Sequence, residues 1–176
     1  MSGDSLALPL SRLATDACEV TTLYRELREP LLRYLVCLGL SGDEAQDVVQ
    51  DTFLTLHRHL ASGGPQDNIR SWVFRVAHNQ ARNRQRSYHR RFGESLDVEI
   101  EALDETTPER LVLEKEKFKR LGKAIALLTD SERECLLLRA AGLRYREISE
   151  ALAIPTSTVG DTVERAIRKL TEKCNV

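Results

Sequence analysis

The sequence predicts an all-α protein made of two small helical domains joined by a flexible acidic linker. Apolar residues recur at helical spacing in every long segment, and no alternating run of β-branched residues indicates a strand. The 176 residues are rich in Leu, Ala, Glu and Arg, and only 5% of them are aromatic. The linker is predicted from composition, because residues 94–109 contain seven acids and neither Lys nor Arg.

Three helices are expected in the first half of the chain, over residues 20–38, 41–61 and 69–90. Pro30 is expected to break or kink the first helix. The loop SGGPQDN separates the second helix from the third. The second helix carries one tight apolar stripe that we expect to be buried: Ala45, Val48, Val49, Thr52, Phe53, Leu56 and Leu60. The buried face expected for the third helix is Ile69, Trp72, Val73, Val76 and Ala77.

The second half is expected to begin with a helix that starts at Pro108, after the linker. Thr129 and Glu132 form a capping-box pattern that opens a short helix ending near Ala140. Another helix is expected over residues 145–153, followed by a turn over residues 153–155 and a last helix that runs to about residue 173. The inside of the last helix is predicted to be Val159, Val163, Ala166, Ile167 and Leu170. The chain then divides into a tail (1–19), a first domain (20–92), the linker (93–107) and a second domain (108–174).

Composition argues against several classes of protein. The net charge of −1 says nothing about which partner the protein binds, and the four cysteines are too far apart for a structural zinc site. Spread-out cysteines and the lack of a signal-peptide pattern or a long apolar run predict a cytoplasmic protein. Asp47 and Asp51 share a helix face, but no third metal ligand accompanies them. Because no catalytic motif is present, we expect neither an enzyme nor a cofactor nor a small-molecule substrate.

The last two helices have the spacing of a helix-turn-helix, whose second helix enters the DNA major groove. An ordinary helical hairpin has the same spacing, so spacing alone leaves both interpretations open. A shared small core is expected from Ile148, Leu152, Ile154, Val159 and Val163. This core would leave six side chains facing out: Ser157, Thr158, Asp161, Glu164, Arg165 and Arg168.

The segment between Asn68 and Gly93 contains seven arginines and no acid. Solvated helix faces usually mix both signs of charge, so this segment favours nucleic-acid binding. Arg and Asn are side chains that contact phosphates and base edges. One face opposite Trp72 is expected to carry Arg75, Asn79, Arg82 and Arg86. Candidates for stacking on unpaired bases are Phe74, Tyr88 and Phe92.

The back of the helix over residues 41–61 carries Leu54 among charged side chains, opposite the apolar stripe. A leucine in this position suggests a contact with another protein, although single surface leucines are common.

Long stretches of the chain resemble a known family. LYRELREPLLRYL, GDEAQDVVQDTFLTLHRHL and NIRSWVFRVAHNQARNRQR resemble region 2 of bacterial sigma factors. LLTDSERECLLLRAAGLRYREISEALAIPTSTVGDTVERAIRKL resembles their region 4. The order of the two regions and the short acidic linker resemble the extracytoplasmic-function (ECF) group of the sigma-70 class.

The resemblance implies a transcription factor that binds core RNA polymerase and directs it to a promoter. Contacts with the β′ coiled coil would fall to Asp47, Gln50, Asp51, Leu54 and Arg58. The −10 element would be opened and held by Asn68 in the loop and by Arg75, Asn79, Arg82, Asn83 and Arg86. Region 4 would read the −35 element through Ser157, Thr158, Asp161, Glu164, Arg165 and Arg168, and would also contact the β flap. An anti-sigma factor is a possible further partner.

The expected recognition helix departs from the family pattern. TVGDTVERA stands where the family often has basic or aromatic residues, so attraction to phosphates should be weak there. Asp161 or Glu164 could instead accept a hydrogen bond from a cytosine amino group. Two alternatives stay open. One is a sigma-like decoy that binds an anti-sigma factor without initiating transcription. The other is a simple helix-turn-helix regulator, which would need neither the Leu54 face nor the basic helix.

Overall fold

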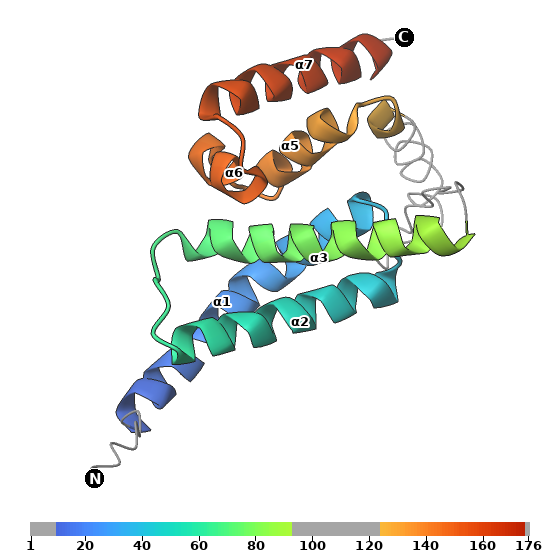
Figure 1. The fold of residues 1–176 in the computed structure, drawn as a ribbon. Coiled ribbons are helices and arrows are strands. Elements are labelled where there is room, and N and C mark those ends of the chain that lie inside the picture. The colour runs from blue at the N-terminus through green and yellow to red at the C-terminus, as the bar shows by residue number, and fades with distance from the viewer. Residues whose placement is uncertain (1–9, 93–123, 175–176) are drawn as a thin grey trace, which may run out of the picture.

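The computed structural model describes residues 10–92 and 124–174, and the side chains of residues 20–87 and 124–173 within them (Figure 1). Every regular element in these ranges is a helix. In chain order they are α1 (Leu10–Cys37), α2 (Gly42–Ala61), α3 (Ile69–Phe92), α5 (Asp130–Ala140), α6 (Tyr145–Leu152) and α7 (Thr156–Cys174). The expected linker and most of the helix expected from Pro108 lie outside the described residues. None of the described helices is long and apolar enough to cross a membrane.

Helix α1 continues through Pro30, so of the two expected effects, a break or a kink, the break does not occur. Pro30 removes one helical hydrogen bond. Leu27 and Leu31 lie on either side of it, and both are almost completely buried. Their packing holds the helix together across the proline, because tertiary contacts rather than local propensity supply most helix stability in a folded protein.

Helix α2 begins and packs as the sequence predicts. Ser41 is its N-cap and forms a capping box with Glu44. The buried residues of α2 are those of the predicted stripe: Ala45, Val48, Val49, Thr52, Phe53, Leu56 and Leu60. α2 packs against α1 and α3, so the three helices form one bundle (Figure 1).

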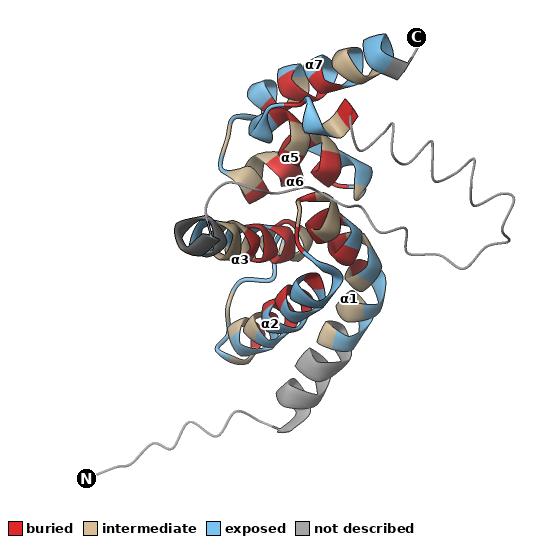
Figure 2. Ribbon diagram, turned by 90° about the vertical axis from the view of Figure 1, so that its right-hand side faces the viewer, coloured by how far each residue is buried: buried red, intermediate tan, exposed pale blue. Residues whose placement is uncertain are grey.

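The second half folds as a smaller group of three helices. Thr129 caps α5 in a reciprocal capping box with Glu132, as expected. Gly142 has a φ of 89°, a backbone conformation that glycine adopts without strain, and it follows the end of α5. α6 and α7 form the helix-turn-helix, with Ile148, Val159 and Val163 fully buried in its core. Buried residues of all three helices face one another (Figure 2).

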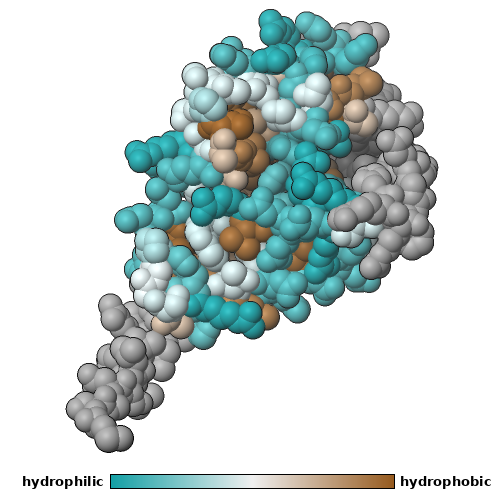
Figure 3. Space-filling view, viewed as in Figure 1, coloured by the Kyte–Doolittle hydropathy of each residue, from teal (hydrophilic) through white to brown (hydrophobic). Residues whose placement is uncertain are grey.

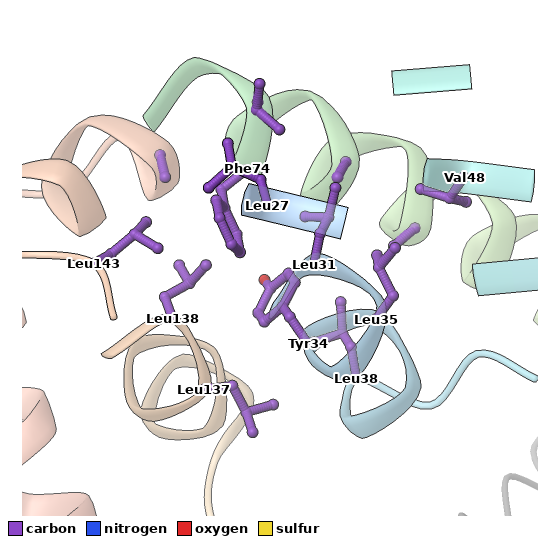
Figure 4. Packing of buried hydrophobic residues seen from close by; sticks show 14 of the residues in the cluster. Leu27, Leu31, Tyr34, Leu35, Leu38, Val48, Phe74, Leu137, Leu138 and Leu143 are labelled. Atoms are coloured by element: carbon purple, nitrogen blue, oxygen red, sulfur yellow. The ribbon is translucent and has the colours of Figure 1, made fainter. Parts of the chain in front are cut away.

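The two halves share one hydrophobic core. α3 lies between the other two helices of its bundle, α1 and α2, and the second group of helices, and it packs against α6 (Figure 1). In Figure 4, Phe74 of α3 and Tyr34 of α1 lie opposite Leu138 of α5 and Leu143. All four side chains are buried and belong to a single cluster. The sequence predicted two domains but not this contact between them.

Three side chains lie in places that the sequence did not predict. Phe74 is fully buried, so its assignment as a stacking residue for unpaired bases was wrong. Its place in the contact between the two halves explains the difference. Ile167 was expected inside α7 but is 50% exposed, whereas Thr162 is buried in the same helix. The viewed face in Figure 3 is mostly hydrophilic, and its hydrophobic residues form small separate spots.

Candidate functional site

The basic face of α3 is the first candidate surface. Arg75, Asn79, Asn83 and Arg86 are exposed on this helix, as expected for side chains that meet a nucleic-acid backbone. Arg82 lies on the same helix but is only partly exposed, because it contacts α5. The neighbouring side chains Tyr88 and Phe92 lie outside the described side chains. The exposed residues form a cationic and amide-rich track along one side of α3.

The loop between α2 and α3 is held in shape by His59. Its imidazole stacks on the indole of Trp72, with ring centroids 4.7 Å apart and an interplanar angle of 24°. Its Nε2 is 3.0 Å from the carbonyl oxygen of Pro65. Its own carbonyl accepts hydrogen bonds from Ser62 Oγ at 2.8 Å and Gly64 N at 2.9 Å. One residue of α2 therefore fixes three positions of the loop that leads into α3.

Gly64 is required by this arrangement. A Cβ atom added at Gly64 would lie 2.3–2.5 Å from three ring atoms of His59. Real Cβ atoms do not come so close, so a side chain at Gly64 would displace the imidazole from Trp72.

Arg82 joins α3 to α5 through two carboxylates. It forms a close ion pair with Glu134 and a second, at 3.5 Å, with Asp130. The Glu134 side chain is 12% exposed and that of Asp130 is 66% exposed. Arg70 adds a hydrogen bond of 2.9 Å from its guanidinium to the carbonyl oxygen of Ala141. Two arginines of the basic helix are thus engaged by the second half of the chain.

The start of α3 is held by one carboxylate of α6. Asn68 Nδ2 donates to Glu150 Oε1 at 3.1 Å, and Ser71 Oγ donates to Glu150 Oε2 at 2.9 Å. Arg146, four residues earlier on α6, pairs with the same carboxylate at 3.3 Å. Asn68 has a φ of 55° and precedes the first residue of α3. Asn68 and Ser71 therefore hold the Glu150 carboxylate at the N-terminal end of α3, where the helix dipole also favours negative charge.

A chain of polar side chains crosses the buried part of the same contact. The Tyr34 hydroxyl lies 2.7 Å from His78 Nδ1, and His78 Nε2 lies 3.9 Å from Glu134 Oε2. Burial, with a further contribution from the charge of Arg82, lowers the pKa of His78 to about 4. Burial also raises the pKa of Glu134, against the opposing effect of Arg82. The imidazole is therefore neutral near pH 7.

The outer face of α2 is the second candidate surface. All five residues expected to bind core polymerase are exposed there: Asp47, Gln50, Asp51, Leu54 and Arg58. Leu54 is 56% exposed. Arg84 of α3 forms ion pairs with Asp47 at 3.6 Å and with Asp51 at 3.3 Å. Arg84 therefore orients two of the carboxylates. No local pattern indicates this contact, because Arg84 is 33 residues from Asp51 in the chain and farther still from Asp47.

The helix-turn-helix is the third candidate surface. The turn after α6 is fixed by Ala153, whose φ is 56°, and by a 2.6 Å hydrogen bond from Ser149 Oγ to the carbonyl oxygen of Ile154. All six residues predicted to face out from α7 are exposed: Ser157, Thr158, Asp161, Glu164, Arg165 and Arg168. The face opposite the helix-turn-helix core is therefore free of α6 and carries both signs of charge.

Glu132 ties α7 to the start of α5. Its Oε2 accepts hydrogen bonds from the backbone N–H of Thr129 at 3.0 Å and from Lys169 Nζ at 2.8 Å. The hydrogen bond from Lys169, together with that from Thr129, lowers the pKa of Glu132. The carboxylate is buried and ionised, so it fixes the end of α7 that lies farther from the turn.

None of the described residues forms a group of three or more metal-ligating side chains. Sequence reasoning missed His59, Arg84, Glu134 and Glu150 as residues that shape these surfaces. Only the His59–Trp72 relationship lay within one short stretch of sequence, and no periodic pattern marks it.

Comparisons with known proteins agree with this geometry. The chain matches the family models Sigma-70 region 2 over residues 23–91 and Sigma-70, region 4 over residues 118–170. The RNA polymerase sigma factor YlaC of Bacillus subtilis is 32% identical over 154 residues, which cover 84% of this chain and 87% of that protein. The ECF RNA polymerase sigma-E factor of Salmonella typhimurium is 33% identical over 144 residues, covering 76% of this chain and 74% of that protein.

A solved structure has the same arrangement of helices. The sigma factor RpoE of Bartonella quintana, in complex with the anti-sigma factor NepR, superposes with a TM-score of 0.66 at 25% identity. The superposition covers 89% of this chain and 96% of that one. Helices α1 to α3 fall within the region 2 match, apart from the N-terminal part of α1, and α5 to α7 fall largely within the region 4 match. The chain belongs to the sigma-70 class of RNA polymerase sigma factors, in the ECF group.

Proposed function

We propose that this sigma factor divides its work among the three surfaces described above. A sigma factor of this class binds core RNA polymerase and directs it to promoters. We assign core binding to the outer face of α2, the −10 element to α3 with the preceding loop, and the −35 element to α7. The observation that carries the proposal is the match to both regions, in order, over residues 23–91 and 118–170.

The assignment to α2 rests on Leu54. An exposed leucine surrounded by charged side chains is suited to the centre of a protein interface, where an apolar anchor becomes desolvated and the charged rim sets orientation. Arg84 holds Asp47 and Asp51 in place before binding, which reduces the side-chain entropy lost in the complex.

The assignment to α3 rests on its charge and on the loop held by His59. A separated promoter strand needs cations for its phosphates and a shaped surface for its unstacked bases. Arg75, Asn79 and Asn83 supply exposed donors on one helix. The loop over residues 62–68 supplies the shaped surface.

The assignment to α7 depends more on hydrogen bonds than on charge. Arg165 and Arg168 can bind phosphates or guanine, and Asp161 and Glu164 can accept from cytosine amino groups. Acids repel the phosphate backbone, so this helix should gain selectivity at the expense of affinity.

In the test, purified core polymerase transcribes fragmented genomic DNA in the presence of this chain. The 5′ ends of the RNA products are then sequenced. We expect new start sites that share two sequence elements at a fixed spacing. Binding to core without any new start sites would favour the decoy, whose partner is an anti-sigma factor. A chain that binds DNA but not core would favour a simple helix-turn-helix regulator. We also propose that the protein acts in the cytoplasm with the polymerase, and that an anti-sigma factor of the kind seen with RpoE is a partner.

A further inference from the structure

We propose that α7 reads two neighbouring C·G base pairs of the −35 element, each through an acid and an arginine that lie four residues apart on the helix. The first of these reading pairs is Asp161 with Arg165, and the second is Glu164 with Arg168. This inference rests on the proposed assignment of α7 to the −35 element, and it adds which bases the helix selects and which side chains select them.

The two reading pairs share one face of α7. Successive residues of an α-helix are rotated by about 100°, so residues 161, 164, 165 and 168 fall within an arc of about 100° around the helix axis. All four side chains are exposed. Figures 1 and 2 both show α7 on the outside of the molecule, on the far side of α5 and α6 from α3. The face is therefore open to a DNA groove as far as the described residues are concerned.

The charges of the reading pairs are not neutralised within the described part of the chain. An acid that precedes an arginine by four residues is in the favourable order for an ion pair on a helix surface. Glu29 and Arg33 of α1 have this order and form such a pair at 3.0 Å. Among the described residues, no ion pair or side-chain hydrogen bond involves any member of the two reading pairs. Their carboxylates and guanidiniums are thus available to a ligand that offers both donors and acceptors.

A C·G base pair offers that pattern in the major groove. Guanine presents two acceptors, O6 and N7, and cytosine presents one donor, its N4 amino group. An arginine donates to the guanine and a carboxylate accepts from the cytosine, so one reading pair satisfies both bases. Thymine presents the acceptor O4 and a methyl group instead, and a carboxylate facing them is left without a donor. Each acid therefore favours cytosine and disfavours thymine at the same position.

The offset between the reading pairs matches neighbouring base pairs. They are three residues apart, which is about 4.5 Å along α7 at a rise of about 1.5 Å per residue. Successive base pairs are about 3.4 Å apart, so the offset is closer to one base step than to two. The residues that precede the reading pairs, Ser157, Thr158 and Gly160, are small, and they allow the first turn of α7 to approach the groove closely.

The test selects duplex DNA from a random-sequence pool with holoenzyme assembled from core polymerase and the full-length chain. Asp161→Asn and Glu164→Gln keep the shape of each side chain and replace the carboxylate by an amide. Asn and Gln bind adenine through its N6 and N7 atoms, so each variant should acquire a new base preference. Glu172→Gln is the matched control, because Glu172 is exposed on the same helix beyond both reading pairs.

We expect wild-type holoenzyme to enrich an upstream element that contains two neighbouring C·G pairs. Glu164→Gln should change the preferred base at one of these pairs from cytosine to adenine, and Asp161→Asn should do so at the other. Each variant should bind its own element about fivefold or more tightly than the wild-type element. Glu172→Gln should enrich the wild-type element, which separates base reading from the general loss of a negative charge.

A second measurement tests the hydrogen bond between the acid and cytosine. N4-methylcytosine still forms its base pair but carries a methyl group in place of the amino hydrogen that faces the major groove, whereas 5-methylcytosine keeps both amino hydrogens. At the pair assigned to Glu164, wild-type holoenzyme should bind the N4-methylated duplex about fivefold or more weakly than the 5-methylated duplex. Glu164→Ala should bind the two methylated duplexes equally.

Two kinds of result separate this inference from the assignment on which it rests. If Glu164→Gln or Asp161→Asn enriches the wild-type element, or if wild type binds both methylated duplexes equally, the reading pair concerned is overturned, while an enriched upstream element still supports α7 at the −35 element. If the pool yields no upstream element, the assignment of α7 is overturned together with both reading pairs.

Discussion

The imidazole of His59 lies stacked on the indole of Trp72, and the same imidazole contacts the carbonyl oxygen of Pro65 at 3.0 Å. A residue near the end of α2 is therefore joined to both the loop and the first turn of α3. The shape of the loop depends on this stack, which makes it a precise target for substitution.

Gly64→Ala should disturb the loop and leave the helical bundle in place. The added methyl group would lie 2.3–2.5 Å from the His59 ring and push it away from Trp72. We expect promoter-strand binding to fall on the order of tenfold, or about 1.4 kcal/mol, with core-polymerase binding unchanged. Gly42→Ala is the control, because a Cβ there has no neighbour within 4 Å. Equal losses in both variants would show that the His59 stack has no part in strand binding.

Leu54→Ala should weaken binding to core polymerase. Loss of an apolar anchor at the centre of an interface costs about 1–3 kcal/mol, or roughly tenfold to a hundredfold in affinity. The melting temperature should hardly change, since Leu54 is 56% exposed in the free protein. Leu127→Ala makes the same change at a leucine of the second half that is 62% exposed. If pull-down on immobilised core gives the same affinity for both variants, the polymerase face lies elsewhere.

Arg165→Ala should weaken binding to the −35 element. A lost base contact costs about 1–3 kcal/mol and relaxes selectivity at one position, whereas a lost phosphate contact lowers the salt slope of binding by about 1. Titrations at several salt concentrations distinguish the two roles. Lys173→Ala, at the far end of α7, is the control. Unchanged −35-dependent transcription in Arg165→Ala would point to a region 4 that does not read DNA through this residue.

Acid should destabilise the folded protein through His78. The ring has an ordinary pKa of 6.5 when the chain is unfolded and a pKa of about 4 when it is folded, because burial disfavours its charged form. The fold is therefore favoured by the neutral ring. The stability linked to His78 is complete above about pH 6.5 and is lost as the pH falls toward 4.

In wild type, this linkage lowers the free energy of unfolding by about 2 kcal/mol when the pH falls from 7.5 to 5. Urea unfolding at the two pH values should show a smaller loss in His78→Gln, which has no titrating ring. The raised pKa of Glu134 acts in the opposite direction, but Glu134 is present in both proteins and cancels in the comparison. His57→Gln, at an exposed position of α2, should keep the wild-type loss. An identical loss in His78→Gln would assign the acid sensitivity to other groups.

The helices and their caps were predictable because each is encoded locally. The α2 stripe repeats at helical spacing, and the capping box of Thr129 and Glu132 lies within four residues. Phe74 was misjudged, and the break considered at Pro30 does not occur, for one reason: both outcomes depend on packing with other parts of the chain. A proline is tolerated where leucines on both sides are buried, and a phenylalanine on a basic helix is hidden where another domain covers it.

The three candidate surfaces were predictable as surfaces, since all the assigned residues of α2 and α7 are exposed. The side-chain contacts that hold these surfaces in place were not predictable. Glu150 contacts Ser71 and Asn68, which precede it in the chain by 79 and 82 positions. In the sequence, Glu150 cannot be distinguished from any other acid on a short helix. Arg82 was expected to be available for DNA, and its pairing with region 4 depends on an arrangement of domains that no local pattern specifies.

The bond between Glu132 and Lys169 limits how region 4 can be re-engineered. A recognition helix taken from another sigma factor would carry new contact residues into the groove, but without Lys169 it would leave a buried, ionised Glu132 unpaired. The incoming helix would then lack the ion pair that fixes the C-terminal part of α7 to the start of α5. A transplant that exchanges promoter preference must therefore include Lys169, or bring its own partner for the start of α5.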